Sequence, residues 1–143
     1  MKKIIFLTFI FCFLALTASK SFACSCALPS RSLEKQIAIA YEKSAAVFYG
    51  EVVEITRDPE KFYVKVKFKV EKSWKNQIES EVVIQTGEGG GDCGYPFNIG
   101  QKYLVYAYGD KNSLGTNICQ RTSPFETDLK YLNKIKKPKL LKK

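Results

Sequence analysis

A strict alternation of apolar and polar residues marks one segment near the middle of the chain. The alternating residues are Phe62, Tyr63, Val64, Lys65, Val66, Lys67, Phe68, Lys69 and Val70. A period of two is what a strand with one buried face and one wet face requires. We therefore predict a strand over residues 62–70, closed by Ser73-Trp74-Lys75-Asn76, with its lysines in solvent.

Four other segments rich in β-branched and aromatic residues predict the rest of a sheet. They span residues 46–56, 81–86, 101–108 and 114–119. Turn-forming residues separate them, in particular residues 57–60, the glycine-rich residues 87–92 and residues 109–112. Gly50 lies inside the first segment, where a bulge is expected. The segments at 46–56 and 62–70 are expected to form a hairpin.

Helical spacing appears on either side of the predicted strands. Ser30 or Ser32 can cap a helix ending near Ser44, with Leu33, Ile37, Ala40 and Tyr41 on one face. Pro124 suits the first turn of a second helix, with apolar positions Phe125, Leu129, Leu132 and Ile135. The prediction is a mainly β domain over residues 24–135, a five-stranded Greek-key barrel of the OB type with a helix at each end. Residues 136–143 form a basic C-terminal tail.

The first 23 residues have the pattern of a signal peptide. Lys2 and Lys3 precede an apolar run over residues 4–18, and small residues precede the predicted cleavage after Ala23. The run is shorter than the roughly 18 apolar residues that a membrane span needs. We predict an exported protein, secreted or periplasmic, whose mature form begins at Cys24. It would be held at a membrane only if Cys24 were lipidated, and Ser21-Phe22 is a poor match to a lipoprotein signal.

Four cysteines remain after this cleavage: Cys24, Cys26, Cys93 and Cys119. An even number in an exported domain indicates two disulfides. A four-thiolate zinc site is the alternative, but Cys93 and Cys119 lack the close spacing of a ligand pair. A bridge between Cys24 and Cys26 would strain the bond geometry, so each should reach a distant partner. Spacing alone leaves two such pairings open.

The charge and the residue types argue against an enzyme. The chain has 23 basic and 14 acidic residues, and losing Lys2, Lys3 and Lys20 leaves a net charge near +6, which favours acidic partners. There is no histidine, which excludes Ser-His-Asp and Cys-His sites. The carboxylates are scattered without the spacing of an acid–base pair. We predict no catalytic residue and no cofactor.

Two basic or glycine-rich features have ordinary explanations. Residues 87–91 lack the following Lys-Ser or Lys-Thr of a phosphate loop, and they are interpreted as a flexible hinge or binding loop. The lysines at 65, 67 and 69 beside Tyr63 could line a nucleic-acid groove. In an exported protein they are better explained as the wet face of a strand, so no nucleic acid is predicted as a partner.

The new chain start carries the candidate chemistry. Cleavage would free the amine of Cys24 in Cys24-Ser25-Cys26, and this amine and the carbonyl of the same residue can form a five-membered chelate on a metal. A terminal amine with a pKa of about 8 loses its proton easily enough near neutrality to bind one. The alternative is that Cys24 only anchors the terminus.

These residues resemble the netrin-like module of the tissue inhibitors of metalloproteinases, including bacterial single-domain relatives. The resemblance covers most of the mature chain and rests on Cys24-Ser25-Cys26, Val47 to Val52, Phe68 to Lys75, Asp92-Cys93-Gly94-Tyr95, Tyr103 to Ala107 and Thr116 to Cys119. It implies an OB barrel with disulfides Cys24–Cys93 and Cys26–Cys119. The third disulfide of the animal inhibitory domain and its C-terminal domain are absent.

The resemblance also implies a partner and a mechanism. The partner is a zinc metalloprotease, and Cys24 would chelate the zinc of that target; no metal is bound by the chain itself. Ser25 would point toward the specificity pocket, and Cys26, Ala27, Leu28, Gly91 and Asp92 would complete the protease-binding ridge of a monomer. The competing hypothesis is a non-inhibitory extracellular or envelope binding module of the netrin type.

Overall fold

The computed structural model describes residues 24–26, 31–57, 60–76, 78–110 and 112–141. The predicted signal peptide and the ridge residues Ala27 and Leu28 lie outside the described residues. The elements in chain order are α2 (Leu33–Lys43), β1 (Ala46–Arg57), β2 (Val64–Lys75), β3 (Glu81–Thr86), the 3-10 turn η1 (Gly90–Asp92), β4 (Lys102–Asp110), β5 (Ser113–Gly115), the 3-10 turn η2 (Glu126–Asp128), α3 (Leu129–Ile135) and β6 (Lys139–Leu140).

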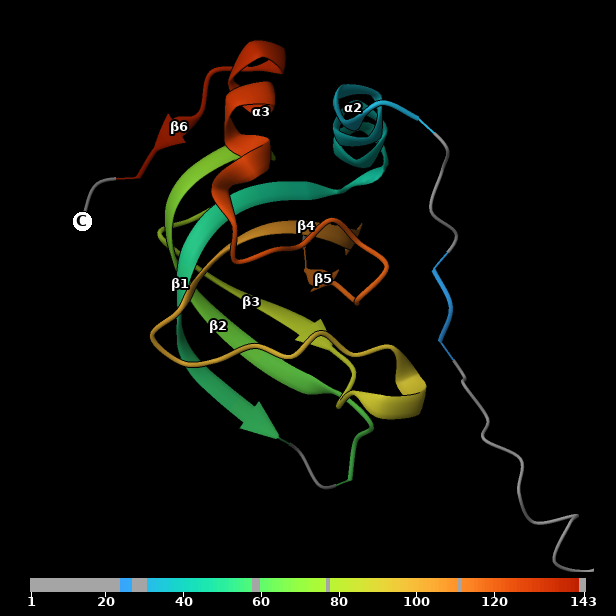
Figure 1. Ribbon diagram of the computed structural model, residues 1–143. Coiled ribbons are helices and arrows are strands. Elements are labelled where there is room, and N and C mark those ends of the chain that lie inside the picture. Colours follow the sequence, from blue (N-terminus) through green and yellow to red (C-terminus); the bar gives the residue numbers. More distant parts are fainter. Residues whose placement is uncertain (1–23, 27–30, 58–59, 77, 111, 142–143) are drawn as a thin grey trace, which may run out of the picture.

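Five of the strands close into a barrel, with both helices at one end of it (Figure 1). The strand order is β1-β4-β5-β3-β2, and β1 pairs directly with β2 to complete the circuit. The β3–β5 pair is parallel, and the other pairs are antiparallel. This order is the Greek-key arrangement of an OB fold, so the predicted fold class is confirmed.

The apolar side chains form two cores on opposite faces of β1 and β4. The barrel interior holds Phe68, with Phe48 and Tyr103 packed edge-to-face against it. The second core lies between the barrel and the helices, and it contains Ile37, Tyr41, Val47, Tyr49, Trp74, Leu104, Tyr106 and Leu132. Both faces of β1 and β4 are covered, which explains their continuous runs of buried residues.

The alternating pattern is confirmed inside β2 and fails at its ends. Val64, Val66, Phe68 and Val70 are all buried. Phe62, in contrast, is 93% exposed, because β2 begins only at Val64. The strand also continues to Lys75, and Trp74 is buried in the second core instead of closing the strand.

The last predicted strand and helix are shorter than expected. β5 is only Ser113–Gly115, whereas the sequence predicted a strand over residues 114–119. Phe125 is 70% exposed because the chain there is extended before η2, and Ile135 ends α3 at 43% exposure. Leu132 is the position of this helix that is fully buried.

Gly50 is the bulge that the sequence predicts. The pairing of β1 with β2 changes register between Tyr49 and Gly50. A Cβ atom on Gly50 would lie 2.6 Å from the carbonyl oxygen of Lys69, closer than real contacts allow. The two strands therefore approach here only because residue 50 has no side chain.

The basic C-terminal segment joins the sheet. β6 pairs antiparallel with β2, with Lys139 opposite Ser73 and Leu140 opposite Lys72. The backbone N–H of Leu141 then donates to the carbonyl of Glu71 at 3.0 Å, and its side chain packs against the barrel core. The chain after α3 is thus fixed to the edge of the barrel.

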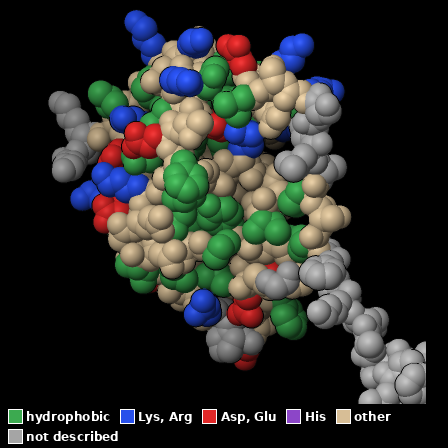
Figure 2. Space-filling model, viewed as in Figure 1, with side chains coloured by type: hydrophobic (Ala, Val, Ile, Leu, Met, Phe, Trp, Pro, Cys, Tyr) green, Lys and Arg blue, Asp and Glu red, His purple; other side chains and the backbone are tan. Residues whose placement is uncertain are grey.

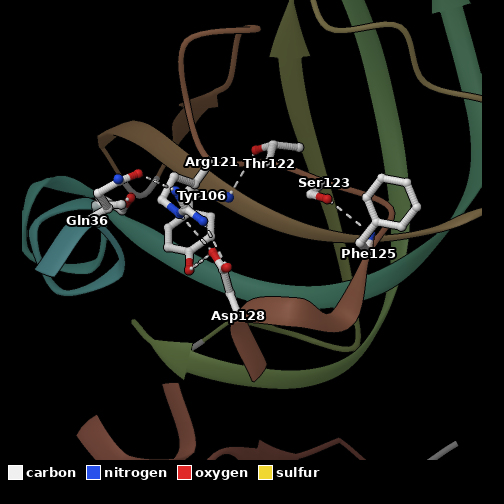
Figure 3. A network of polar contacts seen from close by, with 9 residues as sticks. Gln36, Tyr106, Arg121, Thr122, Ser123, Phe125 and Asp128 are labelled. Carbon is white, nitrogen blue, oxygen red and sulfur yellow. Dashed lines mark hydrogen bonds and ion pairs between the residues drawn. The ribbon is translucent and has the colours of Figure 1, made fainter. Parts of the chain in front are cut away.

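A polar network ties the helices to β4 (Figure 3). Arg121 donates from Nε and Nη2 to the two carboxylate oxygens of Asp128, at 2.8 and 2.9 Å, and from Nη1 to Gln36 of α2 at 3.1 Å. The hydroxyl of Tyr106 donates to the same carboxylate at 3.0 Å. Asp128 is 5% exposed, and its hydrogen bond is the largest cause of a raised pKa at Arg121.

Replacing Asp128 by Ala should lower the free energy of unfolding by about 2–3 kcal/mol, because Arg121 and the Tyr106 hydroxyl would keep their burial and lose their acceptor. Equilibrium urea denaturation measures this change. The matched control is Glu126→Ala, which removes an exposed carboxylate that accepts one hydrogen bond from Tyr49. It should cost about 1 kcal/mol or less. Equal losses for the two variants would contradict the role given to the network.

Candidate functional site

The parallel pairing of β3 and β5 brings two distant parts of the chain to one edge of the barrel. Gln85 lies opposite Gly115, and the N–H of Thr116 donates to the carbonyl of Gln85 at 2.9 Å. The carboxyl ends of parallel strands meet at the same edge, so the chain leaving β3 and the chain leaving β5 run together. A further backbone hydrogen bond, from Ile118 to Cys93 at 3.0 Å, joins them.

The two disulfides attach the chain at residues 24–26 to this edge of the barrel. Cys24 is bonded to Cys93 and Cys26 to Cys119, with Cα atoms 5.6 and 5.2 Å apart. The pairing implied by the family resemblance is confirmed, and the four sulfurs are therefore not zinc thiolates. Ser25 is exposed between the two bridges.

Cys24 also approaches the glycine-rich loop. Its Sγ lies 3.5 Å from the carbonyl oxygen of Gly91, and Gly91 is exposed. Of the predicted ridge residues, the structure thus brings Cys24, Ser25, Cys26 and Gly91 together on one face. This face, made of residues 24–26 and Gly91, is called the N-terminal face below.

Asp92 belongs to the same loop, and its side chain is directed to the backbone. The carboxylate accepts hydrogen bonds from the N–H groups of Glu88, Gly89 and Gly94 at 2.7, 2.9 and 3.1 Å. The amide of Gly94, followed by that of Glu88, lowers the pKa of Asp92. A Cβ on Gly94 would collide with the carbonyl of Gly87, so the loop is closed tightly on itself. The loop has a defined shape, and Asp92 is the residue that sets it.

Sequence reasoning did not single out Ile118 as part of the site. Its side chain is 42% exposed, its backbone is bonded to Cys93, and the next residue is Cys119. It therefore borders the N-terminal face as an apolar neighbour. The sequence placed it inside a strand, and only the early end of β5 at Gly115 reveals that it lies in a loop.

Within the described part of the chain, no group of three or more His, Cys, Asp or Glu side chains could hold a metal ion. No helix among these residues has the length and apolarity to cross a bilayer. The two disulfides indicate an oxidising, extracytoplasmic location.

Comparison with known proteins adds no identification. The chain matches no model of a known protein family, and no curated protein is significantly similar to it. The structure itself shows a disulfide-bonded five-stranded β-barrel domain.

The role of Asp92 predicts a pH-dependent change confined to its loop. A lowered pKa means that the stabilisation is complete above the ordinary aspartate value of about 3.9 and disappears as the pH falls through the lower folded value. The amide proton shifts of Glu88, Gly89 and Gly94, followed by NMR, should therefore move together with a midpoint below about 3.9.

The matched control compares two aspartates that cap different loops. Asp92→Asn should abolish this shared titration, whereas Asp110→Asn should leave it intact, because Asp110 accepts from Asn112 and Ser113 in another turn. Three separate midpoints, or a titration that persists in Asp92→Asn, would show that Asp92 does not organise the loop.

Proposed function

We propose that the mature chain, beginning at Cys24, is a secreted inhibitor of zinc metalloendopeptidases. The observation that supports it is the clamping of Cys24 and Cys26 to two adjoining loops with Ser25 exposed between them. A chain terminus held in this way is a rigid wedge. Little ordering entropy would be lost when it enters a substrate cleft.

The chemistry resides in the backbone of Cys24. Its free amine and its carbonyl oxygen would chelate the target's zinc in a five-membered ring, at the position that a catalytic water occupies in such enzymes. The amine must be neutral to bind, so binding would release its proton. The metal belongs to the protease, and the inhibitor supplies only the two donor atoms.

The residues around Cys24 would provide the remaining contacts. Ser25 would enter the specificity pocket, and the backbone of Gly91 would lie along the cleft. Asp92 would act indirectly by holding the shape of the loop, and Ile118 would add an apolar contact at the border. The resemblance extends the ridge to Ala27 and Leu28.

The mechanism requires an unmodified amine at residue 24. Mass spectrometry of the exported protein should find a mature chain that begins at Cys24, carries two disulfides and has no acyl group. An acylated Cys24, or cleavage at another residue, would exclude the chelation mechanism.

One added residue tests the chelation directly. An Ala inserted before Cys24 should weaken inhibition of zinc endopeptidases by at least about a hundredfold, equivalent to about 2.7 kcal/mol, because the chelating amine becomes an amide. The measurement is the inhibition constant against a panel of zinc endopeptidases with a peptide substrate. The melting temperature should be nearly unchanged, since no core contact is altered.

The matched control carries the same Ala after Lys143 and should inhibit as the native chain does. Equal potency of the two extended forms would refute chelation through Cys24. A correctly processed native chain that inhibits no member of the panel would refute inhibition itself and favour the non-inhibitory binding module.

A further inference from the structure

The positive charge of this protein is concentrated at its C-terminal end. Residues 24–129 contain 13 basic and 14 acidic side chains and are almost neutral. The last 14 residues, 130–143, contain seven lysines and no aspartate or glutamate. The net positive charge of the mature chain therefore arises from residues 130–143 alone. Such an asymmetric distribution of charge is expected of a surface that meets an anionic partner.

Part of this segment lines a groove of about 420 Å³. Its lining residues are Ser73, Trp74, Asn76, Lys136, Lys137 and Lys139, and we call it the lysine groove. Pairing of β6 with β2 places Lys139 opposite Ser73, so the groove is fixed by the sheet. Figure 2 shows lysine and arginine side chains gathered at the end of the molecule where Figure 1 places α2 and α3.

The lysines of the groove keep their charge uncompensated. Within the described residues, Lys136, Lys137 and Lys139 form no ion pair with a carboxylate. Lys75, from the same end of β2, is instead satisfied by the carbonyls of Tyr41 and Glu42 at 2.9 and 2.8 Å. Three like charges around one hollow repel each other, and a multivalent anion would relieve this repulsion.

The side chains of the groove are compatible with phosphate or sulfate groups. Arginine binds carboxylate and phosphate alike through its planar fork, whereas lysine ammonium groups are point charges that bind phosphate without that fixed geometry. Ser73 and Asn76 lie in the same lining, where the hydroxyl of Ser73 donates to the backbone carbonyl of Asn76 at 3.1 Å. The hollow shape suits a narrow chain better than the flat surface of a bilayer.

We propose that the lysine groove binds a linear polyanion that carries phosphate or sulfate groups. In Figure 1, β6 and residues 24–26 lie on opposite sides of the molecule, and Lys139 of β6 lines the groove, so the proposal is independent of protease inhibition. A polymer seated there would leave the N-terminal face open.

Trp74 makes the proposal testable at one place in the molecule. It is the only tryptophan in the chain and it lines the groove. Linear polyphosphate and dextran sulfate should each be titrated into the processed protein, with affinity measured by calorimetry and location by Trp74 fluorescence. At least one should bind saturably, shift the emission, and bind roughly tenfold or more weakly when salt rises from about 50 to 200 mM.

The matched variants remove equal charge from different places. Lys136→Gln, Lys137→Gln and Lys139→Gln together should weaken binding at least about tenfold, and Lys137→Gln alone should weaken it about threefold. Lys35→Gln, Lys65→Gln and Lys69→Gln together remove three exposed lysines elsewhere and should change it less than about twofold. Circular dichroism verifies that each variant is folded.

Several results would overturn the proposal. Equal weakening by the two triple variants would mean that only net charge matters. Binding without a change in Trp74 emission would place the polymer elsewhere. Tighter binding of polyglutamate than of polyphosphate or dextran sulfate would contradict the preference for phosphate or sulfate groups. Binding of anionic phospholipid vesicles, but of neither polyphosphate nor dextran sulfate, would identify a membrane surface as the partner.

Discussion

The two disulfide bonds fix a chain segment that has no secondary structure of its own. Residues 24–26 belong to no helix or strand, and their described contacts are the sulfur bridges and the approach of Cys24 to Gly91. The bridges close loops with sequence separations of 69 and 93 residues. In the chain-entropy model, one loop of this size contributes about 4–5 kcal/mol, and two overlapping loops contribute less than the sum. Without them, the N-terminal face would not exist as a defined surface.

The barrel determines where these bridges attach. Because β3 and β5 are parallel, Cys93 and Cys119 follow strands that end at the same edge, although they are 26 positions apart in the sequence. The chain next to each of these two cysteines is held in place by further contacts. Asp92 closes the loop before Cys93, and Arg121, two residues after Cys119, is anchored to Asp128. Sulfur bridges, loop hydrogen bonds and a partly buried ion pair thus position one small face.

The sequence predicted those elements whose two faces differ. Within β2, Val64 to Val70 alternate because one face meets the barrel core and the other meets water. The pattern misleads at Phe62, where the period starts before the strand does, and at Trp74, where the helices cover the second face. Periodicity reports only local environment, so it cannot show which distant element covers a strand.

Contacts between distant residues were beyond such reasoning. Nothing local pairs Tyr106 with Asp128, and the spacing of the cysteines left two disulfide pairings open until the resemblance favoured one.

Residues 24–26 and β6 are additions to a barrel that is already closed. β1 pairs directly with β2, so neither residues 24–26 nor β6 is needed to complete the circuit of strands. Among the described residues of these two segments and the chain directly beside them, Leu141 is the one that packs against a core, at the margin of the barrel interior. Surface residues that carry no packing role can change without a large loss of stability. The N-terminal face and the lysine groove are therefore free to specialise separately on one rigid scaffold, and each is attached to it by different chemistry: sulfur bridges for the first and strand pairing for the second.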